Sequence, residues 1–297
     1  MSGATDIREG APPAKRELPR WLTRLPLHIV VIALVLIWMI PSIGLFINSF
    51  RSPTDITSSG WWTALFPPEN FTLDNYAYVI GRSGIGDAFV NSLFIAIPAT
   101  IIPVFVAAFA GYAFAWFRFP GRNVIFLAVV ALLVVPLQTT FIPLLQLFAP
   151  LGWNGEFLSV WLAHTGYGLP FAIYLLRNFM SELPREVFES ADIDGAGSAT
   201  KFFRLAIPMT IPAIAALAIF QFLFTWNDLL VAFVFIGASN PTNLPLTVVV
   251  ANLVQSTGGG WQYLAAAAFL TMAVPLVVFL ALQRYFVRGL TGGAVKG

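Results

Sequence analysis

Long apolar stretches with almost no charge alternate with short polar segments along this chain of 297 residues. Only 10% of the residues are charged, against about 25% in soluble globular domains, so lipid is the solvent for most of the sequence. Each stretch is long enough to cross a hydrocarbon core of roughly 30 Å as an α-helix. The stretches comprise residues 27–50, 89–116, 124–148, 157–180, 209–236 and 263–286. The predicted fold class is therefore an all-α, polytopic membrane protein with six transmembrane helices.

The basic residues divide unevenly between the two sides that six spans would define. All of the 16 Lys and Arg except Arg51 and Arg82 fall in or beside the two tails and the segments after the second and fourth spans. Segments rich in Lys and Arg stay in the cytoplasm. The sequence therefore predicts a multi-pass protein with both termini cytoplasmic, residues 51–87 external and residues 181–208 cytoplasmic.

Residues 181–208 form the longest charged interruption in the second half of the chain. Asp194-Gly195 predicts a turn, because glycine tolerates a positive φ. Ser198 can cap a helix after the turn, and Pro208 marks the entry into the next apolar stretch. The pattern predicts a helix–turn–helix outside the membrane with apolar residues available for contact, and an ordinary solvated loop is the alternative. The apolar pairs on shared helix faces are Val187 with Ala191 and Phe202 with Ala206.

Composition and missing motifs exclude several kinds of chemistry. There is no cysteine, hence no disulfide, thiolate nucleophile or Cys-based metal site. The sequence contains no P-loop pattern, so the chain is not expected to hydrolyse ATP by itself, and no metal or cofactor is expected in it. A net charge of +2 is too small to argue for binding of nucleic acid.

A face for close helix contact is predicted within the second span. Ala107, Gly111 and Ala115 recur there every four residues, and the alternative is that they are mere apolar filler.

The segment ESADIDGAGSATKFFRLAIP at 189–208 resembles the EAA motif of permease subunits of binding-protein-dependent ABC importers. That motif has E-A-A, three residues, Gly, nine residues and then I-x-L-P. Glu189, Ala191, Gly195 and Pro208 stand at the matching positions. The departures from the motif are Ser190, Leu205 and Ile207, which are close in size to the residues that they replace. Residues 91–122 resemble the start of the permease core, and the ending GLTGGAVKG resembles that of the MalG-type subunit of sugar importers.

The resemblance implies the type I permease fold of ABC importers, in the cytoplasmic (inner) membrane of a bacterium and surrounded by membrane lipid. The implied partners are a second permease subunit, two cytoplasmic ATPase subunits that bind ATP and Mg, and an external solute-binding protein. The implied substrate is a sugar, an α-glucoside or a maltose/trehalose-type oligosaccharide. The resulting division is a cytoplasmic tail (1–24), a first transmembrane helix (25–50), an external loop (51–87), a permease core (88–288) and a second cytoplasmic tail (289–297).

In this interpretation residues 181–208 couple the permease to the ATPase as a rigid helix pair. The residues expected in the coupling loop are Glu189, Ala191, Asp194, Gly195, Phe203 and Pro208. A solvated surface acid is the alternative for Glu189.

Polar side chains in the fourth and fifth spans are candidates for the substrate path. The candidates are Gln221, Thr225, Asn227, Asp228, His164 and Tyr167. A carboxylate in a span is costly unless it is paired or functional, which singles out Asp228. Its position near the outer boundary also suits a structural role, capping or pairing with Arg82 or the partner permease. We expect His164 to form a helix–helix hydrogen bond, and Trp226 to stack on a sugar ring or to sit in the interfacial aromatic belt.

Two other functions fit a polytopic chain. An ion-coupled secondary transporter needs intramembrane charges or unwound helices paired between repeats, but this sequence has one boundary Asp and no detected repeat. A membrane-embedded enzyme needs a cluster of His, Asp or Cys, and no such cluster is evident in the sequence.

Overall fold

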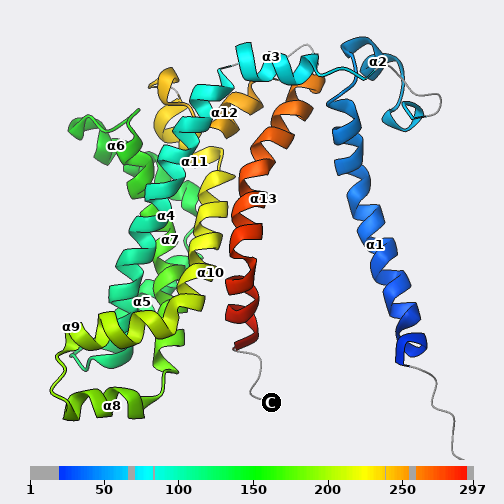
Figure 1. Ribbon diagram of the computed structural model, residues 1–297. Helices are drawn as coiled ribbons and strands as arrows, with labels where there is room; N and C mark the ends of the chain where they lie inside the picture. Colours follow the sequence, from blue (N-terminus) through cyan, green and yellow to red (C-terminus); the bar gives the residue numbers. More distant parts are fainter. Residues whose placement is uncertain (1–19, 66–70, 83, 238, 254–258, 293–297) are drawn as a thin grey trace, which may run out of the picture.

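A computed structural model describes residues 20–65, 71–82, 84–237, 239–253 and 259–292, and this part of the chain is dominated by helices (Figure 1). The all-α, membrane-spanning architecture is confirmed. The predicted tails 1–24 and 289–297 lie mostly outside the described residues.

Within the described residues, four helical runs are long and apolar enough to cross a membrane. They are α1 (Arg20–Asn48), α4 (Ile85–Trp116), the run Ser198–Trp226 that ends in α10 (Ile207–Trp226), and α13 (Trp261–Gly292). A fifth helix, α7 (Phe157–Ser181), has 25 residues but a more polar sequence. At about 1.5 Å per residue it is also long enough to span the hydrocarbon core.

The predicted third span, residues 124–148, is not one continuous helix. A 99° bend at Val135 and Pro136 divides it into two arms. Pro136 has no N–H for the helical ladder, and it holds Val135 in an extended conformation with φ −73° and ψ 119°. The first arm is α5 (Arg122–Ala131) with η2 (Leu132–Val134), and the second is η3 (Leu137–Thr140), α6 (Phe141–Phe148) and η4 (Ala149–Leu151).

The predicted fifth span, residues 209–236, is wrong at both ends. Its helix starts before the apolar stretch and stops at Trp226. A break at Asn227–Leu229 separates α10 from α11 (Leu230–Ala232) and the π-helical turn η6 (Phe233–Gly237). Beyond these come η7 (Pro241–Asn243) and α12 (Leu246–Ala251).

The centre of the bundle is the contact between α4 and α7. A Cβ atom added to Gly111 would lie 3.0 Å from the backbone nitrogen of Arg177, so these two helices meet almost backbone to backbone. Ala107 is fully buried on the same face of α4. The small-residue face predicted from the sequence is therefore confirmed, and α10 packs against both helices.

The helix α1 stands apart from the bundle over most of its length (Figure 1). It meets α13 near the C-terminal end of α1, where Phe46 and Phe269 lie edge to face at 5.1 Å. The connection after α1 folds into α2 (Pro53–Ser58), η1 (Trp61–Thr63) and α3 (Asp74–Arg82). Buried Arg51 holds it together by donating to the carbonyl oxygen of Asp55 at 2.9 Å.

Candidate functional site

The loop between α7 and α10 is a helix pair, as the sequence predicts. Its first helix is α8 (Arg185–Ile193) and its second is α9 (Ser198–Lys201). Gly195 has φ +75°, in the left-handed region that favours glycine, and its N–H donates to the carbonyl oxygen of Asp192 at 3.0 Å. The N–H of Asp194 donates to the carbonyl oxygen of Ser190 at 3.1 Å, which closes the last turn of α8.

The caps and the end of the loop differ from the prediction. Ser198 is the first residue of α9, and Gly197 occupies the cap position without a side-chain hydrogen bond. Pro208 does not separate the loop from the span, because the helix runs unbroken from Ser198 to Trp226. The π-helical turn η5 (Phe202–Ala206) precedes Pro208, and its wider i→i+5 pattern lets a residue without an N–H enter the helix.

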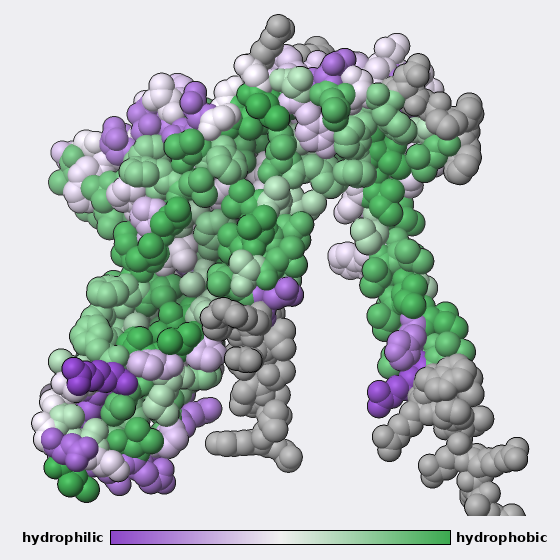
Figure 2. Space-filling model, viewed as in Figure 1, coloured by the Kyte–Doolittle hydropathy of each residue, from purple (hydrophilic) through white to green (hydrophobic). Residues whose placement is uncertain are grey.

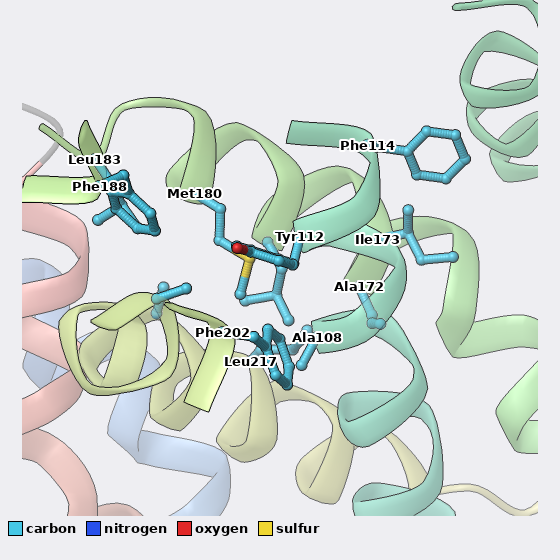
Figure 3. Close-up of a cluster of buried hydrophobic side chains, with 14 residues drawn as sticks. Ala108, Tyr112, Phe114, Ala172, Ile173, Met180, Leu183, Phe188, Phe202 and Leu217 are labelled. Carbon is cyan, nitrogen blue, oxygen red and sulfur yellow. The ribbon is translucent and has the colours of Figure 1, made fainter. Parts of the chain in front are cut away.

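Aromatic side chains seat the loop on the ends of the membrane helices. Phe188 of α8 is 2% exposed and stacks on Trp116 of α4 with ring centroids 3.8 Å apart. The indole N–H of Trp116 donates to the carbonyl oxygen of Met180 in α7 at 3.1 Å. Phe188 belongs to a cluster of buried hydrophobic side chains from α4, α7, the loop and α10. Figure 3 shows this cluster, with Phe188 beside Leu183 at one end. The loop is therefore packed onto α4 and α7.

Phe202 and Ala206 are buried in the same cluster and are not available to a partner, contrary to the sequence prediction. Phe202 packs against Tyr112 with ring centroids 5.1 Å apart, and it lies near Leu217 and Ala108 in Figure 3. The reason is that η5 turns this face toward α4 rather than toward solvent.

The opposite surface of the helix pair carries exposed apolar side chains. Ile193 is 88% exposed at the end of α8, and Phe203 is 58% exposed beside the second helix. Val187 is partly exposed, as predicted, and Glu189 is exposed on the flank of α8. The remaining candidates are half-buried Ala191 and exposed Pro208.

The candidate path residues form a second group, toward the other end of α7 and α10. Gln221 is buried on α10 and donates to the carbonyl oxygen of Ala99 in α4 at 3.2 Å. Its side chain lies over Gly168 of α7, where an added Cβ would come within 2.5 Å of the amide oxygen. A side chain at position 168 would therefore displace the amide of Gln221 from this polar contact between three helices.

The side chain of His164 does not form the predicted helix–helix hydrogen bond, although its backbone carbonyl oxygen accepts from Gln221 at 3.5 Å. Its ring is fully buried, and within the described residues neither ring nitrogen has a hydrogen-bond partner. Nε2 lies 3.6 Å from Oδ2 of Asp228, and the ring packs edge-on against Phe224. The imidazole therefore fills space between α7 and α10 and faces a carboxylate.

Asp228 caps the helix that restarts after the break. Its two carboxylate oxygens accept from the N–H groups of Val231 at 3.3 Å and Ala232 at 3.0 Å. Its carbonyl oxygen accepts from the hydroxyl of Thr247 at 2.7 Å. Capping was one of the roles expected for it. Pairing with the side chain of Arg82 lies outside the described residues.

The other path candidates differ in their accessibility. Thr225 is buried, and within the described residues its hydroxyl has no hydrogen-bond partner. The Tyr167 hydroxyl lies 2.7 Å from that of Thr140, and Asn227 is exposed at the end of α10. Trp226 is 2% exposed and donates to the carbonyl oxygen of Thr271 in α13, so it is neither a belt residue nor free to stack on a sugar.

The structure thus separates the sequence candidates into a loop group and a membrane group, linked by α7 and α10 (Figure 1). The sequence reasoning missed Phe188 and Trp116, which hold the loop in place. The available signals were an aromatic residue at the end of the second apolar stretch, Trp116, and an aromatic residue inside the charged segment, Phe188. Within the described residues, no group of three or more His, Asp or Glu could hold a metal ion.

The family described as binding-protein-dependent transport system inner membrane component matches residues 103–292. The chain is 53% identical over 276 residues to the osmoprotective compounds uptake permease protein GgtD of Synechocystis, covering 92% of each chain. It is 56% identical over 242 residues to the alpha-glucoside transport system permease protein AglG of Rhizobium meliloti, covering 80% of this chain and 63% of that one. The fold matches a chain in the crystal structure of a bacterial ABC transporter that imports alginate, with a TM-score of 0.63, 14% identity and coverage of 90% and 97%.

Proposed function

The chain belongs to the family of binding-protein-dependent transport system inner membrane components, and from this premise we propose that it is the permease subunit of an ATP-driven sugar importer. The substrate class is an α-glucoside or a related oligosaccharide. The similarity to an alpha-glucoside transport system permease protein supports this substrate.

The observation that carries the proposal is the rigid seating of the helix pair between α7 and α10. An ATPase subunit that binds the exposed tip at Ile193 and Phe203 would move α8 and α9 together, because Asp192 and Lys201 form an ion pair between the two helices. The stack of Phe188 on Trp116 passes that motion to α4. Rigid-body motion of packed helices is an established way to transmit such a signal.

The second helix of the pair gives a direct connection to the membrane core. Since α9, η5 and α10 are one continuous helical run, a displacement of the loop also moves α10. This helix carries Gln221 and ends shortly before Asp228. We assign the path to Gln221, Thr225, Asn227, Asp228, His164 and Tyr167. Buried polar atoms without partners, such as those of His164 and Thr225, are suited to meet sugar hydroxyls when the path opens.

The division of labour follows from the same proposal. Two separate cytoplasmic ATPase subunits bind ATP and Mg, and this chain has no ATPase site of its own. A second permease subunit completes the path, and an external solute-binding protein delivers the sugar to the face formed by α2 and α3. Both termini and the coupling loop are cytoplasmic in the bacterial inner membrane, because that side carries nearly all of the Lys and Arg.

Reconstituted transport tests this function. The complex that co-purifies with the tagged chain is placed in liposomes with its binding protein, and uptake of a labelled α-glucoside is measured. We expect uptake to require ATP and to persist when ionophores collapse ion gradients. Uptake that needs an ion gradient and no ATP would instead identify an ion-coupled transporter. An arabinooligosaccharide and a neutral amino acid are added as competitors. Whether each one inhibits uptake of the labelled α-glucoside shows which chemical class of substrate the transporter accepts.

A further inference from the structure

A basic hollow lies behind the coupling loop, between the loop and the ends of α4 and α7. It has a volume of ≈ 490 Å³. The loop end of the bundle, where its lining residues lie, has a largely hydrophilic surface, at the lower left of Figure 2. Its basic lining residues are Arg118, Arg122, Arg177, Arg185 and Lys201. Two acids also line it, Glu189 and Asp192, and Asp192 is paired with Lys201. Four arginines therefore face a single remaining carboxylate.

Two of these arginines are held in position by the protein. Arg177 lies over the ring of Phe126 at 4.8 Å, and one of its guanidinium nitrogens donates to the side-chain oxygen of Asn178 at 2.9 Å. Arg122 donates from one nitrogen to the carbonyl oxygen of Phe117 at 3.1 Å. Within the described residues none of the four arginines makes an ion pair. A guanidinium fork that is fixed and keeps free N–H groups is suited to a phosphate group.

The surroundings of the hollow point to a lipid. A second hollow, of ≈ 400 Å³, shares Arg118 and Arg122 and continues to Val124. From there the flank of α5 is apolar and open, with Val124 72% and Leu127 68% exposed. The basic hollow is thus continuous with a surface for acyl chains, and its tryptophan, Trp116, is a residue type typical of headgroup depth.

We propose that this hollow binds the phosphate headgroup of an anionic phospholipid, whose chains lie along α5. Basic pockets between transmembrane helices on the cytoplasmic side are suited to such headgroups. The bound lipid would hold the loop against the bundle, because Arg185 belongs to α8. The assignment to the cytoplasmic leaflet rests on the proposed orientation, whereas lipid binding itself does not.

The test compares lipid binding by the complete transporter complex and its variants. Native mass spectrometry measures the apparent Kd for phosphatidylglycerol and for phosphatidylcholine. The variant Arg118→Gln/Arg122→Gln is expected to raise the Kd for phosphatidylglycerol about 25-fold, at roughly fivefold per arginine. The matched control, Arg24→Gln/Arg204→Gln, removes two exposed charges that do not line the hollow and should leave this Kd unchanged.

Three outcomes would overturn the proposal. One is equal affinity of the wild type for the two lipids, and another is equal loss of affinity in both double variants. The third is displacement of phosphatidylglycerol by inorganic phosphate at similar concentrations, which would identify a site for a soluble anion. None of these outcomes bears on whether uptake requires ATP, so the proposed function is judged separately.

Discussion

Replacing Phe188 by alanine is expected to release α8 from the bundle while the transmembrane helices stay inserted. Phe188 is 2% exposed and its ring stacks on Trp116. Removing a buried phenylalanine costs about 3–5 kcal/mol. A loss of about 3 kcal/mol corresponds to a roughly 100-fold rise in local opening. Insertion does not depend on this contact, because it rests on the apolar length of the spans.

The measurement is hydrogen exchange of the α8 amides in the assembled complex, with sugar-stimulated ATP hydrolysis in the same preparation. We expect fast exchange in residues 185–193 and hydrolysis that no longer responds to sugar. The control is Val187→Ala, which truncates the neighbouring, partly exposed side chain. If hydrogen exchange and sugar-stimulated ATP hydrolysis in Phe188→Ala equal those of the control, the stack of Phe188 on Trp116 does not transmit the coupling.

Gly195→Val is expected to uncouple the transporter by backbone strain alone. The φ of Gly195 is +75°, and a Cβ atom added there would meet nothing within 4 Å. The substitution therefore causes no clash with neighbouring residues, and its cost is the left-handed conformation itself, about 1–3 kcal/mol for a residue other than glycine. A β-branched side chain is among the least tolerant of positive φ. The turn should open, and α8 and α9 should lose their fixed relation.

The matched control is Gly197→Val, which makes the same substitution two residues away. Gly197 has φ −67° and also has open space around its added Cβ, so valine fits there. Gly195→Asn is a second control, because asparagine visits the left-handed region more readily. Stimulated ATP hydrolysis should fall in Gly195→Val only. A similar fall in Gly197→Val would show that side-chain bulk in the loop, rather than φ, is responsible.

Most of the fold that could be predicted from the sequence follows from the length of the apolar stretches and from the residues at the turns. The backbone N–H and C=O groups of a long apolar run have no water to bond in lipid, so the run must form a helix, which predicts the bundle. Asp194-Gly195 predicts its turn because the need for positive φ is local. Pro136 was harder to interpret, because neighbouring groups in a membrane helix can satisfy the carbonyls that a proline leaves free. Whether proline kinks or breaks a helix therefore depends on packing.

The side-chain arrangement of the candidate site depends on tertiary contacts. Helical periodicity does not tell which of Val187 and Phe188 faces the bundle, since either face of α8 has an apolar residue. The approach of His164 to Asp228 brings together residues from two helices, and it depends on where α10 breaks. The basic hollow likewise joins the loop after α4 to α8, two segments that are separate in sequence.

Site-directed crosslinking from the tip of the loop tests the central claim, that this helix pair is where the ATPase acts on the permease. The chain has no cysteine, so Ile193→Cys places one thiol at an 88% exposed position at the end of α8. Ser58→Cys is the matched control, exposed on α2 at the opposite end of the bundle. Each is loaded with a photoactivatable thiol reagent in native membranes. The account predicts that Ile193→Cys crosslinks to the ATPase subunit and that Ser58→Cys does not; a crosslink to the ATPase from Ser58→Cys, or none from Ile193→Cys in an assembled complex, would contradict it.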